Sequence, residues 1–568
     1  MLNLSNRNTF ATLLDAIALN DENAERDAII YLETDHVPIH VSQREFRHNV
    51  LRHAAALRQM GIDGRDLVVI AHTQNLESIY AFWGALVAGA IPSMFPTLTE
   101  KLDPDIYLRS MAELARLSEV RAILTTDEFA PVMREHVPCA VYASQQLAES
   151  VARSDVDSFT PHAPNPDEIA FLQHSSGTTG LQKGVALSHR AVLNQVASYS
   201  DAIALTDRDV VVSWLPLYHD MGLIAGFLMP LIQGVPLVLM SPFDWVAHPA
   251  LLLRAIHDYH GTLCWLPNFT YNHCARRIRQ RDSDGVSLSS MRLFINCSEP
   301  VRSESHQQFL ERFAANGVTH EMLAVSYAMA ENTFAVTQTP LGQAARLDVI
   351  DRSALEADRF AKPIAPDHPN AQIRVSCGPC ISGTHAKAID VEGHTLADRH
   401  VGQIAVKSDC MLSGYYKRPD LDPFSDGWYR TGDMGYIAEG EIYIVGRSKD
   451  LIINAGKNVY PQDIEAIVNT VPGVHAGRAV AFGVFDEREG TELIGVVAEV
   501  DAAIADATDP IEKKQIAQQI RQIVTKQSMI TISYVHLVDD RWLIKTSSGK
   551  IARAANRDKW LAEVQRTA

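Results

Sequence analysis

The ten residues from Ser175 to Gly184 carry the side-chain types that bind a polyphosphate. Their sequence, SSGTTGLQKG, holds three glycines, four hydroxyl residues and one lysine. Glycines leave backbone N–H groups unobstructed, and hydroxyls and a lysine add donors and positive charge. The segment is not a Walker A loop, because glycine follows the lysine. Strand-like residues on both sides favour a phosphate site over a flexible surface loop. Its predicted members are Ser175, Ser176, Gly177, Thr178, Thr179, Gly180 and Lys183.

Six further motifs with polar or charged residues follow this loop along the chain. They are SWLPLYHDMG (213–222), SEP (298–300), YAMAE (327–331), YRTGD (429–433), GRSKD (446–450) and SGK (548–550). Each motif alone is weak, but together and in this order they resemble the acyl-adenylate-forming superfamily. That superfamily contains acyl-CoA synthetases, luciferases and peptide-synthetase adenylation domains. The resemblance covers the chain from about residue 40 to 555.

The resemblance implies attack of a carboxylate on the α-phosphate of ATP, a reaction that brings two anions together. The site must therefore supply positive charge where the pentacoordinate centre forms. Lys550 is similar to the family's catalytic lysine, although a lysine near a C-terminus can also be a solvated cation. Glu331 resembles the Mg²⁺ ligand, since a hard carboxylate oxygen suits that ion, with Thr179 as a second ligand.

The nucleotide contacts implied by the resemblance lie in four of the motifs. Asp433 and Arg447 match the ribose contacts, and the adenine contacts are expected at Ser298, Glu299, Pro300, Tyr327 and Ala328. By itself, Tyr327 could equally be a core residue. His219 matches the histidine at the carboxylate end of the acyl pocket, but next to an aspartate it could also be structural.

Local patterns indicate how these motifs are positioned. Residues 41–61 have helical spacing, 66–72 read as a buried strand, and a second helix ends near Gly89. This alternation predicts an α/β fold with helix-covered parallel sheets. Towards the C-terminus, a strand at 441–445 leads through a polar turn into an amphipathic helix that begins after Pro461.

The polar turn is the predicted domain boundary. We expect a large N-terminal domain of helix-covered sheets (1–446), a hinge (447–449) and a small α+β C-terminal domain (450–568). Lys449 occupies the family's hinge position, about which the small domain rotates between two half-reactions. Its charged neighbours also allow an ordinary surface role.

Composition and net charge restrict the kinds of partner and compartment that are expected for this protein. With 568 residues and a net charge of −17, the chain is large enough for two domains and is not expected to bind nucleic acid. Seven scattered cysteines without a framework of spacings favour a reducing cytoplasm. The apolar stretch 223–240 is broken by Pro230 and a Gly-Val-Pro turn, so we expect a buried helix and strand there, with no stable membrane insertion.

A long segment after Pro340 points to one branch of the superfamily. Residues 341–378, with the insertion itself at about 341–376, resemble the insertion of fatty acyl-AMP ligases. In that branch a fatty or other carboxylic acid passes from acyl-AMP to the phosphopantetheine thiol of an acyl carrier protein, or of a carrier domain in a polyketide or peptide synthase. A variable surface loop of an acyl-CoA synthetase is the alternative.

Other classes fit less well. Asp244 is the candidate to pair the α-ammonium if the enzyme activated an amino acid. A non-catalytic homologue is disfavoured because Lys550, Glu331, Asp433 and Arg447 are all present. A hydrolase is disfavoured because the chain lacks a Gly-x-Ser-x-Gly elbow.

The predicted acyl pocket departs from the branch. Where fatty acyl-AMP ligases have two glycines before Pro-Asn-Phe, this chain has Trp265 and Leu266 before Pro267, Asn268 and Phe269. We assign Trp265, Leu266, Asn268 and Phe269 to the substrate pocket. The added bulk predicts a shorter or unusually shaped acid.

Overall fold

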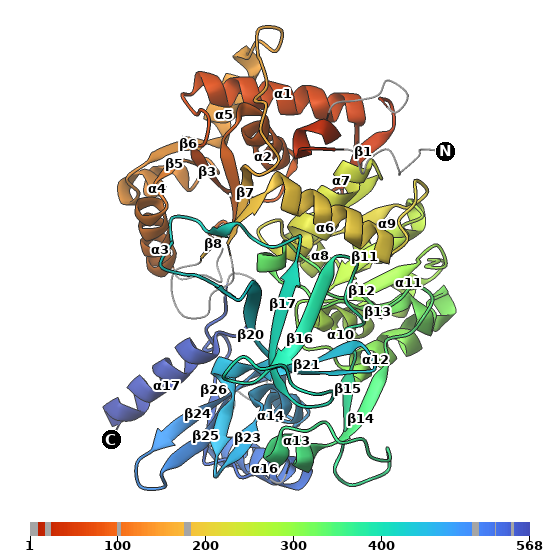
Figure 1. Cartoon of the computed structure of the whole chain (residues 1–568), viewed down its shortest axis with the longest axis vertical. Coiled ribbons are helices and arrows are strands. Elements are labelled where there is room, and N and C mark those ends of the chain that lie inside the picture. The colour runs from red at the N-terminus through yellow and green to blue at the C-terminus, as the bar shows by residue number, and fades with distance from the viewer. Residues whose placement is uncertain are drawn as a thin grey trace.

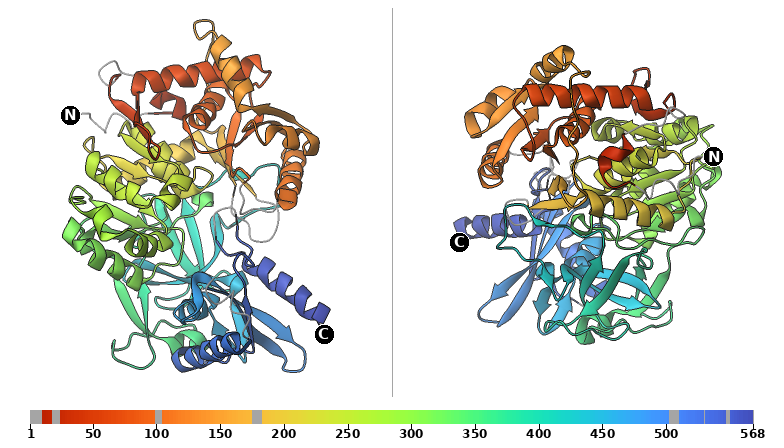
Figure 2. Two further views of the ribbon diagram at one scale, coloured as in Figure 1. Left: turned by 180° about the vertical axis from the view of Figure 1, so that it is seen from behind. Right: turned by 45° about the horizontal axis from the view of Figure 1, so that its top comes forward.

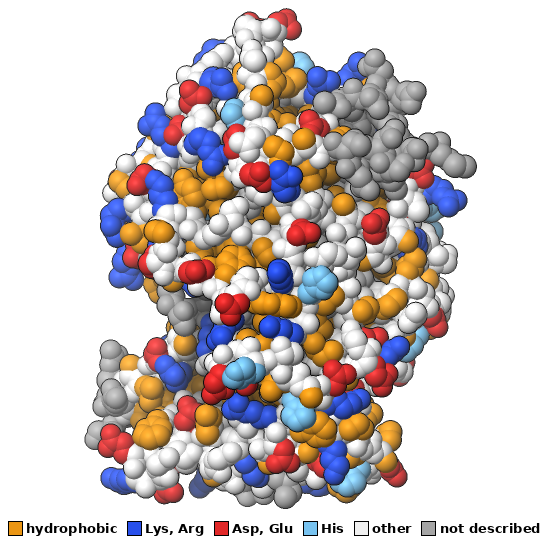
Figure 3. All heavy atoms as spheres, in the orientation of Figure 1, with side chains coloured by type: hydrophobic (Ala, Val, Ile, Leu, Met, Phe, Trp, Pro, Cys, Tyr) orange, Lys and Arg blue, Asp and Glu red, His pale blue; other side chains and the backbone are white. Residues whose placement is uncertain are grey.

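The computed structural model describes residues 10–17, 24–98, 104–174, 183–501, 510–528, 530–546 and 550–567. Over these residues the protein is α/β, with sheets covered by helices, as predicted. The elements near the N-terminus and those near the C-terminus lie at opposite ends of the elongated molecule (Figure 1). Figure 3 shows basic side chains interspersed with acidic ones over one face of the molecule.

A four-stranded parallel sheet, with the order β4-β3-β5-β6, lies near the N-terminus. Its strands are β3 (Leu67–Ala71), β4 (Ile91–Phe95), β5 (Val120–Thr125) and β6 (Ala140–Ala143). The neighbouring helices are α1 (Gln43–Gln59), α2 (Leu76–Ala88), α3 (Pro104–Leu117), α4 (Ala130–His136) and α5 (Ser144–Arg153). A capping box between Ser42 and Glu45 starts α1, and Gly89, at φ 88°, ends α2. The elements predicted between residues 41 and 89 are confirmed.

The central sheet has seven strands in the order β13-β12-β11-β9-β10-β1-β2 and is parallel except for the β1–β2 pair. Its strands are β1 (Asp27–Leu32), β2 (Ile39–Ser42), β9 (Val211–Ser213), β10 (Leu237–Met240), β11 (Leu263–Leu266), β12 (Leu293–Asn296) and β13 (Leu323–Val325). The stretch 223–240 forms the π-helix η4 (Met221–Leu228), α7 (Met229–Gln233) and β10, all buried. The predicted buried helix and strand are therefore confirmed.

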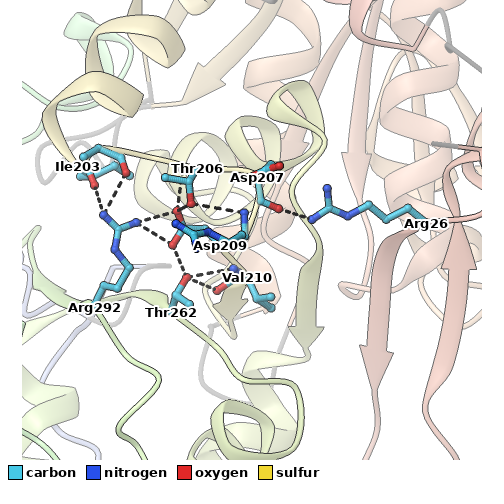
Figure 4. Close-up of polar contacts among 10 residues, drawn as sticks. Arg26, Ile203, Thr206, Asp207, Asp209, Val210, Thr262 and Arg292 are labelled. Carbon is cyan, nitrogen blue, oxygen red and sulfur yellow. Dashed lines mark hydrogen bonds and ion pairs between the residues drawn. The ribbon is translucent and has the colours of Figure 1, made fainter. Parts of the chain in front are cut away.

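Further helices pack around this sheet. They are α6 (His189–Ala202), α8 (Pro242–Ala247), α9 (Ala250–Asp258), α10 (Asn268–Arg277), α11 (Gln280–Ser283) and α12 (Ser303–Phe313). The backbone of β9 begins beside a buried ionic network (Figure 4). Asp209 is 1% exposed, and both its carboxylate oxygens accept from Arg292 Nη1 at 2.7 Å. Thr262 and Thr206 also donate to this carboxylate, and Arg292 donates to Ile203 O beyond the end of α6. The network joins α6 to the starts of β9, β11 and β12.

Antiparallel strands connect these layers to the C-terminal part. The third sheet contains β16 (Thr384–Ile389), β17 (Gly402–Ser408), β19 (Phe424–Ser425), β20 (Trp428–Ala438) and β21 (Glu441–Arg447). A separate hairpin of β7 (Ile169–His174) and β8 (Gly184–Ser188) pairs with β18 (Gly414–Tyr415). The strands predicted on either side of the glycine-rich loop are thus confirmed, and the loop connects the two strands of the hairpin.

The insertion and the C-terminal elements complete the fold. The insertion consists of β14 (Leu347–Asp351), α13 (Arg352–Asp358) and β15 (Ala371–Val375). The C-terminal elements are β22 (Ile452–Asn454), β23 (Lys457–Val459), α14 (Pro461–Val468), β24 (Val474–Asp486), β25 (Thr491–Val500), α16 (Pro510–Ser528), β26 (Tyr534–Val538) and α17 (Arg553–Thr567). Residues 452–532 of the C-terminal part contain a hydrophobic core of their own. Helix α17 packs on β24 through Trp560, and its C-terminal end extends outward from this part (Figures 1 and 2).

Candidate active site

Asp433 lies where β20, β21 and the segment after β13 meet. It lies in β20, opposite Arg447 of β21, while Tyr327 follows β13. The Tyr327 hydroxyl donates to Asp433 Oδ2 at 2.6 Å, and Arg447 Nε donates to Oδ1 at 3.1 Å. Burial, and then Asp433, raise the pKa of Tyr327, so its hydroxyl remains a donor. The structure thus brings together a carboxylate that accepts two hydrogen bonds, an aromatic ring and a guanidinium. These groups suit the paired hydroxyls and the base of a nucleoside.

Glu331 lies beside the hairpin that carries the glycine-rich loop. The hydroxyl of Tyr415, in β18, donates to Glu331 Oε1 at 3.1 Å and lies 3.2 Å from the hydroxyl of Tyr429. Burial raises the pKa of the Glu331 carboxyl, while its own backbone N–H and the two tyrosines oppose the shift. Lys183 Nζ lies over the Tyr415 ring, 4.8 Å from its centroid. A half-buried carboxyl group and the loop lysine therefore both contact Tyr415.

Lys550 and three carboxyl-bearing or imidazole side chains form the third part of the site. His219 Nδ1 lies 2.6 Å from Asp220 Oδ1. Burial alone would raise the pKa of Asp220, but His219, Lys550 and the N–H of Met221 outweigh it, so the pKa lies below its usual range. Burial raises the pKa of Glu299, and Lys550 is the largest opposing influence. The Lys550 ammonium thus lies within electrostatic reach of Asp220 and Glu299.

The loop that presents Lys550 is fixed from both sides. Thr546 N–H donates to Lys550 O at 2.7 Å, and the Ala552 N–H donates to Ile544 O at 3.0 Å. Residues 545 and 551 form an antiparallel bridge. Residues 547–549, which include Ser548 and Gly549 of the SGK motif, lie outside the described residues. The backbone on both sides of them is thus held together by the contacts of Thr546 and Ala552.

The residues assigned to the acyl pocket separate onto two faces of the central sheet. Trp265 Nε1 donates to the Tyr199 hydroxyl of α6 at 2.8 Å. Cys264 pairs in register with Phe294 of β12, whose ring packs against Phe309 of α12. Cys264 therefore lies on the opposite face of the sheet from Trp265. Because successive side chains of a strand alternate, Leu266 shares the face of Cys264. Trp265 and Leu266 therefore do not line one pocket.

Asn268 and Phe269 lie where β11 passes into α10. Asn268 is buried, and its side chain bonds Ser305, Asn296 and the N–H of Arg302. Phe269 is 43% exposed, and its N–H donates to Glu299 Oε2 at 3.0 Å. The Asn268 side chain thus links neighbouring segments of the chain to one another, whereas Phe269 lies beside Glu299, in the part of the site that contains Lys550.

The remaining predicted residues have these positions. Ser298 adopts φ 71° beside Glu299, Pro300 is exposed, and Ala328 bridges Ala335. Lys449, in the short helical turn η8 (Ser448–Asp450), is exposed next to Arg447. Ser175, Ser176, Gly177, Thr178, Thr179 and Gly180 lie outside the described residues. The sequence did not single out Tyr415, Tyr199 or Asp220; for Asp220, its place beside His219 was the available signal.

Comparisons with known proteins identify the class. The sequence pattern of the AMP-binding enzyme family matches residues 18–416, more than half of this chain, which therefore belongs to that family. It is 30% identical to the medium-chain-fatty-acid–[acyl-carrier-protein] ligase JamA of Moorena producens, over 97% of this chain and 95% of that protein. It is also 30% identical to 4-hydroxyphenylalkanoate adenylyltransferase of Mycobacterium tuberculosis, over 87% and 82%.

The solved structures narrow the class further. A structure from a study of fatty acyl-adenylate ligases of E. coli and L. pneumophila superposes with a TM-score of 0.88, at 26% identity over 99% of each chain. Within the AMP-binding family, this chain is therefore similar to fatty acyl-adenylate ligases. Among the described residues, no helix combines the length and apolar character needed to cross a membrane.

Proposed function

We propose that this enzyme joins a carboxylic acid of the fatty class to the AMP moiety of ATP and then transfers the acyl group to a carrier-protein thiol. In the first step a carboxylate oxygen attacks the α-phosphorus, the bond to the bridging oxygen breaks, and pyrophosphate leaves. The observation that carries the proposal is the position of the Lys550 ammonium within electrostatic reach of Asp220 and Glu299. The same pose contains the hydrogen bond from the Tyr327 hydroxyl to Asp433. A cation is thus present where charge must be neutralised.

Each end of the proposed nucleotide site has its own groups. We assign the ribose to Asp433 and Arg447 and the adenine to Tyr327, Ala328 and the backbone of Ser298, Glu299 and Pro300. The loop residues 175–180 and Lys183 would hold the outer phosphates. His219, fixed by Asp220, is placed to orient the substrate carboxylate.

The residues around Glu331 fit a magnesium ion. The carboxylate is half-buried, its pKa is raised by loss of solvent, and its partner Tyr415 supplies a neutral donor. A hard divalent cation supplies the positive charge that a buried carboxylate requires and binds ATP oxygens. We propose Glu331 and Thr179 as its protein ligands.

We divide the chain as the sequence suggested, into 1–446, a hinge at 447–449 and a mobile part at 450–568. Support comes from the separate core of residues 452–532 and from the exposure of Lys449. On the far side of the hinge, Arg553 Nη1 donates to Asp450 Oδ2 at 2.6 Å and Nη2 to Glu465 at 2.8 Å. Asp450 would therefore move with α17, so that rotation about Lys449 repositions Lys550.

The insertion contacts this mobile part directly. Arg374 of β15 donates to both carboxylate oxygens of Asp463 in α14, at 3.2 and 2.8 Å. Outside the insertion, Arg302 at the N-cap of α12 lies 3.6 Å from the same carboxylate and donates to Gln462 O at 2.8 Å. Arg359 donates to Asn458 Oδ1, at 2.9 Å from Nη2. These contacts, which we call the insertion latch, favour the pose that holds Lys550 in the site.

The latch supports a carrier protein as acceptor over free coenzyme A. Thioester formation requires the thiolate to attack the acyl carbonyl with loss of AMP, after the mobile part has rotated. A latch that stabilises the first pose depresses the second unless a partner compensates for the lost contacts. A docked carrier protein can do so, and the name of JamA states a carrier-protein acceptor for that relative.

All seven cysteines are free, which supports a reducing compartment such as the cytoplasm.

Acid-dependent ATP–pyrophosphate exchange tests the first step. The expected result is exchange that requires an acid, with acyl-AMP accumulating when coenzyme A is the only thiol present. Acyl transfer should then appear on addition of a phosphopantetheinylated carrier protein. Efficient acyl-CoA formation by the unmodified enzyme would replace this proposal with an acyl-CoA synthetase, and absence of exchange with every acid would reject both.

A further inference from the structure

Buried side chains of α6, β11 and the segment after β13 form a hydrogen-bonded cluster, which we call the wall. Trp265 donates to the Tyr199 hydroxyl at 2.8 Å, and Tyr199 donates to Gln338 Oε1 at 2.9 Å. All three side chains are at most 3% exposed. The ring of Phe334 packs edge-on against Tyr199, with centroids 5.3 Å apart. These side chains come from α6, β11 and the segment after β13, so they hold one another in place.

The wall lies next to the residues that handle the carboxylate. The end of β12 connects the two, since Ser298 Oγ lies 3.8 Å from both Cys297 Sγ and the Sδ of Met221, which follows Asp220. Trp265 pairs with Ile295 of β12, so strand alternation places Cys297 on the same face of the sheet as Trp265. Helix η4 begins immediately after Asp220 and packs on β9 and β11. A Cβ at Gly226 of this helix would lie 2.6 Å from Ser213 Oγ, so η4 is as close to the sheet as glycine permits. The acyl tail therefore has little depth available beyond Asp220.

Gln195 adds an unsatisfied polar group to the same side of α6. It lies one helical turn before Tyr199, on the same helix face, and is 0% exposed. Neither its amide oxygen nor its amide nitrogen has a hydrogen-bond partner among the residues that the structure describes. Buried polar atoms are nearly always paired in folded proteins, since an unpaired one carries its full desolvation penalty. The amide therefore indicates a ligand with a hydrogen-bonding group.

We propose that α6 selects the acid: Tyr199 and Trp265 limit the length of the tail, and Gln195 hydrogen-bonds an oxygen that the tail carries. The substrate class is a short carboxylic acid with a hydroxyl or carbonyl oxygen in its tail. A long unsubstituted chain fits poorly, because close packing resists added methylenes and a hydrocarbon leaves the Gln195 amide unpaired. This inference rests on the proposed adenylate formation and names the substrate of that same site.

The length limit is tested by measuring kcat/KM for exchange with saturated acids of increasing length. The wild type should prefer the shorter acids. Trp265→Gly should move the preference to longer acids, with a gain of about tenfold or more for each acid newly accommodated. Cys264→Ala, on the opposite face of the same strand, is the matched control and should leave the profile unchanged. An unaltered profile in the Trp265 variant would overturn the length limit.

The oxygen contact is tested by the ratio of kcat/KM for an acid with a hydroxylated tail to that for the unsubstituted acid of equal length. In the wild type this ratio should exceed one. Gln195→Met, which keeps the volume but removes both polar atoms, should lower it about tenfold, the effect of one hydrogen bond. An identical ratio in the variant would show that water alone satisfies the amide and would overturn the contact.

The same measurements distinguish failure of the proposed adenylate formation from failure of the proposed selection by α6. If no acid supports exchange in the wild type, the proposed adenylate formation is wrong. If exchange occurs but long unsubstituted acids are the best substrates, adenylate formation stands and the selection by α6 is wrong.

Discussion

Removing Arg374 should release the insertion latch. Arg374 is 7% exposed and makes a bidentate ion pair with Asp463 across the contact between the insertion and α14. Removing one partner of a buried pair costs about 3–5 kcal/mol, because the other charge stays buried and uncompensated. Arg302, 3.6 Å from Asp463, retains part of the attraction, so we take the lower limit. About 3 kcal/mol corresponds to roughly a hundredfold change between the two poses.

The variant Arg374→Met keeps the length of the side chain and removes its charge. With ATP, acid and free coenzyme A, we expect the fraction of acyl-AMP converted to acyl-CoA to rise by up to about a hundredfold. The control is Arg346→Met, since Arg346 pairs with Glu439 and Glu441, both of which precede the hinge. Both variants should retain ATP–pyrophosphate exchange. If a folded Arg374→Met enzyme partitions acyl-AMP like the wild type, the latch does not control the acceptor.

Four further outcomes test other parts of the structure. Lys550→Ala should lower pyrophosphate exchange by at least about 10²–10³ yet still transfer preformed acyl-AMP to a carrier; near-normal exchange would refute its role. Glu331→Gln should raise the Mg²⁺ concentration needed for half-maximal exchange, and an unchanged Mg²⁺ titration would argue against it as a ligand. Asp209→Ala should lower the free energy of unfolding of the large domain by about 3–5 kcal/mol, because Arg292 loses its carboxylate partner, and the unfolding midpoint should fall. The double variant Asp209→Ala/Arg292→Met should recover part of this loss, and no recovery would contradict the pairing. Burial raises the pKa of Glu356 from its usual value of 4.5 to about 7, so the docked insertion is most stable when this carboxyl is protonated and loses stability as pH rises towards 7. Acyl-CoA formation should therefore be greater at pH 8 than at pH 6, and Glu356→Gln should remove this difference; a variant that keeps it would sink the assignment. The charged groups that face Glu356 are Arg352, Arg374, Lys457 and Asp463.

The sequence by itself determined most elements of the fold. The helix after Ser42 and the end of α2 at Gly89 follow from capping and from the left-handed conformation that glycine adopts readily. The buried strands on both sides of the glycine-rich loop are equally local signals. The order of motifs indicated the superfamily, because several chemically necessary residue types recur at their expected places along the chain.

Only the tertiary structure decided how the site is assembled. Tyr327 and Asp433 lie 106 residues apart in the chain, and no local pattern predicts that their side chains meet. Strand alternation separates Trp265 from Leu266, which the sequence had placed in one pocket, because adjacent side chains point to opposite faces of a sheet. Tyr199 gains its importance only from contacts made across α6 and β11.

The same holds for the insertion latch. The sequence marked an insertion but could not place Arg374 against Asp463, since that ion pair depends on how the C-terminal part docks. Periodicity and capping are properties of neighbouring residues and can be read along a chain. Burial, charge pairing and pocket depth depend on elements distant in sequence, so they are fixed only when the sheets and helices have packed.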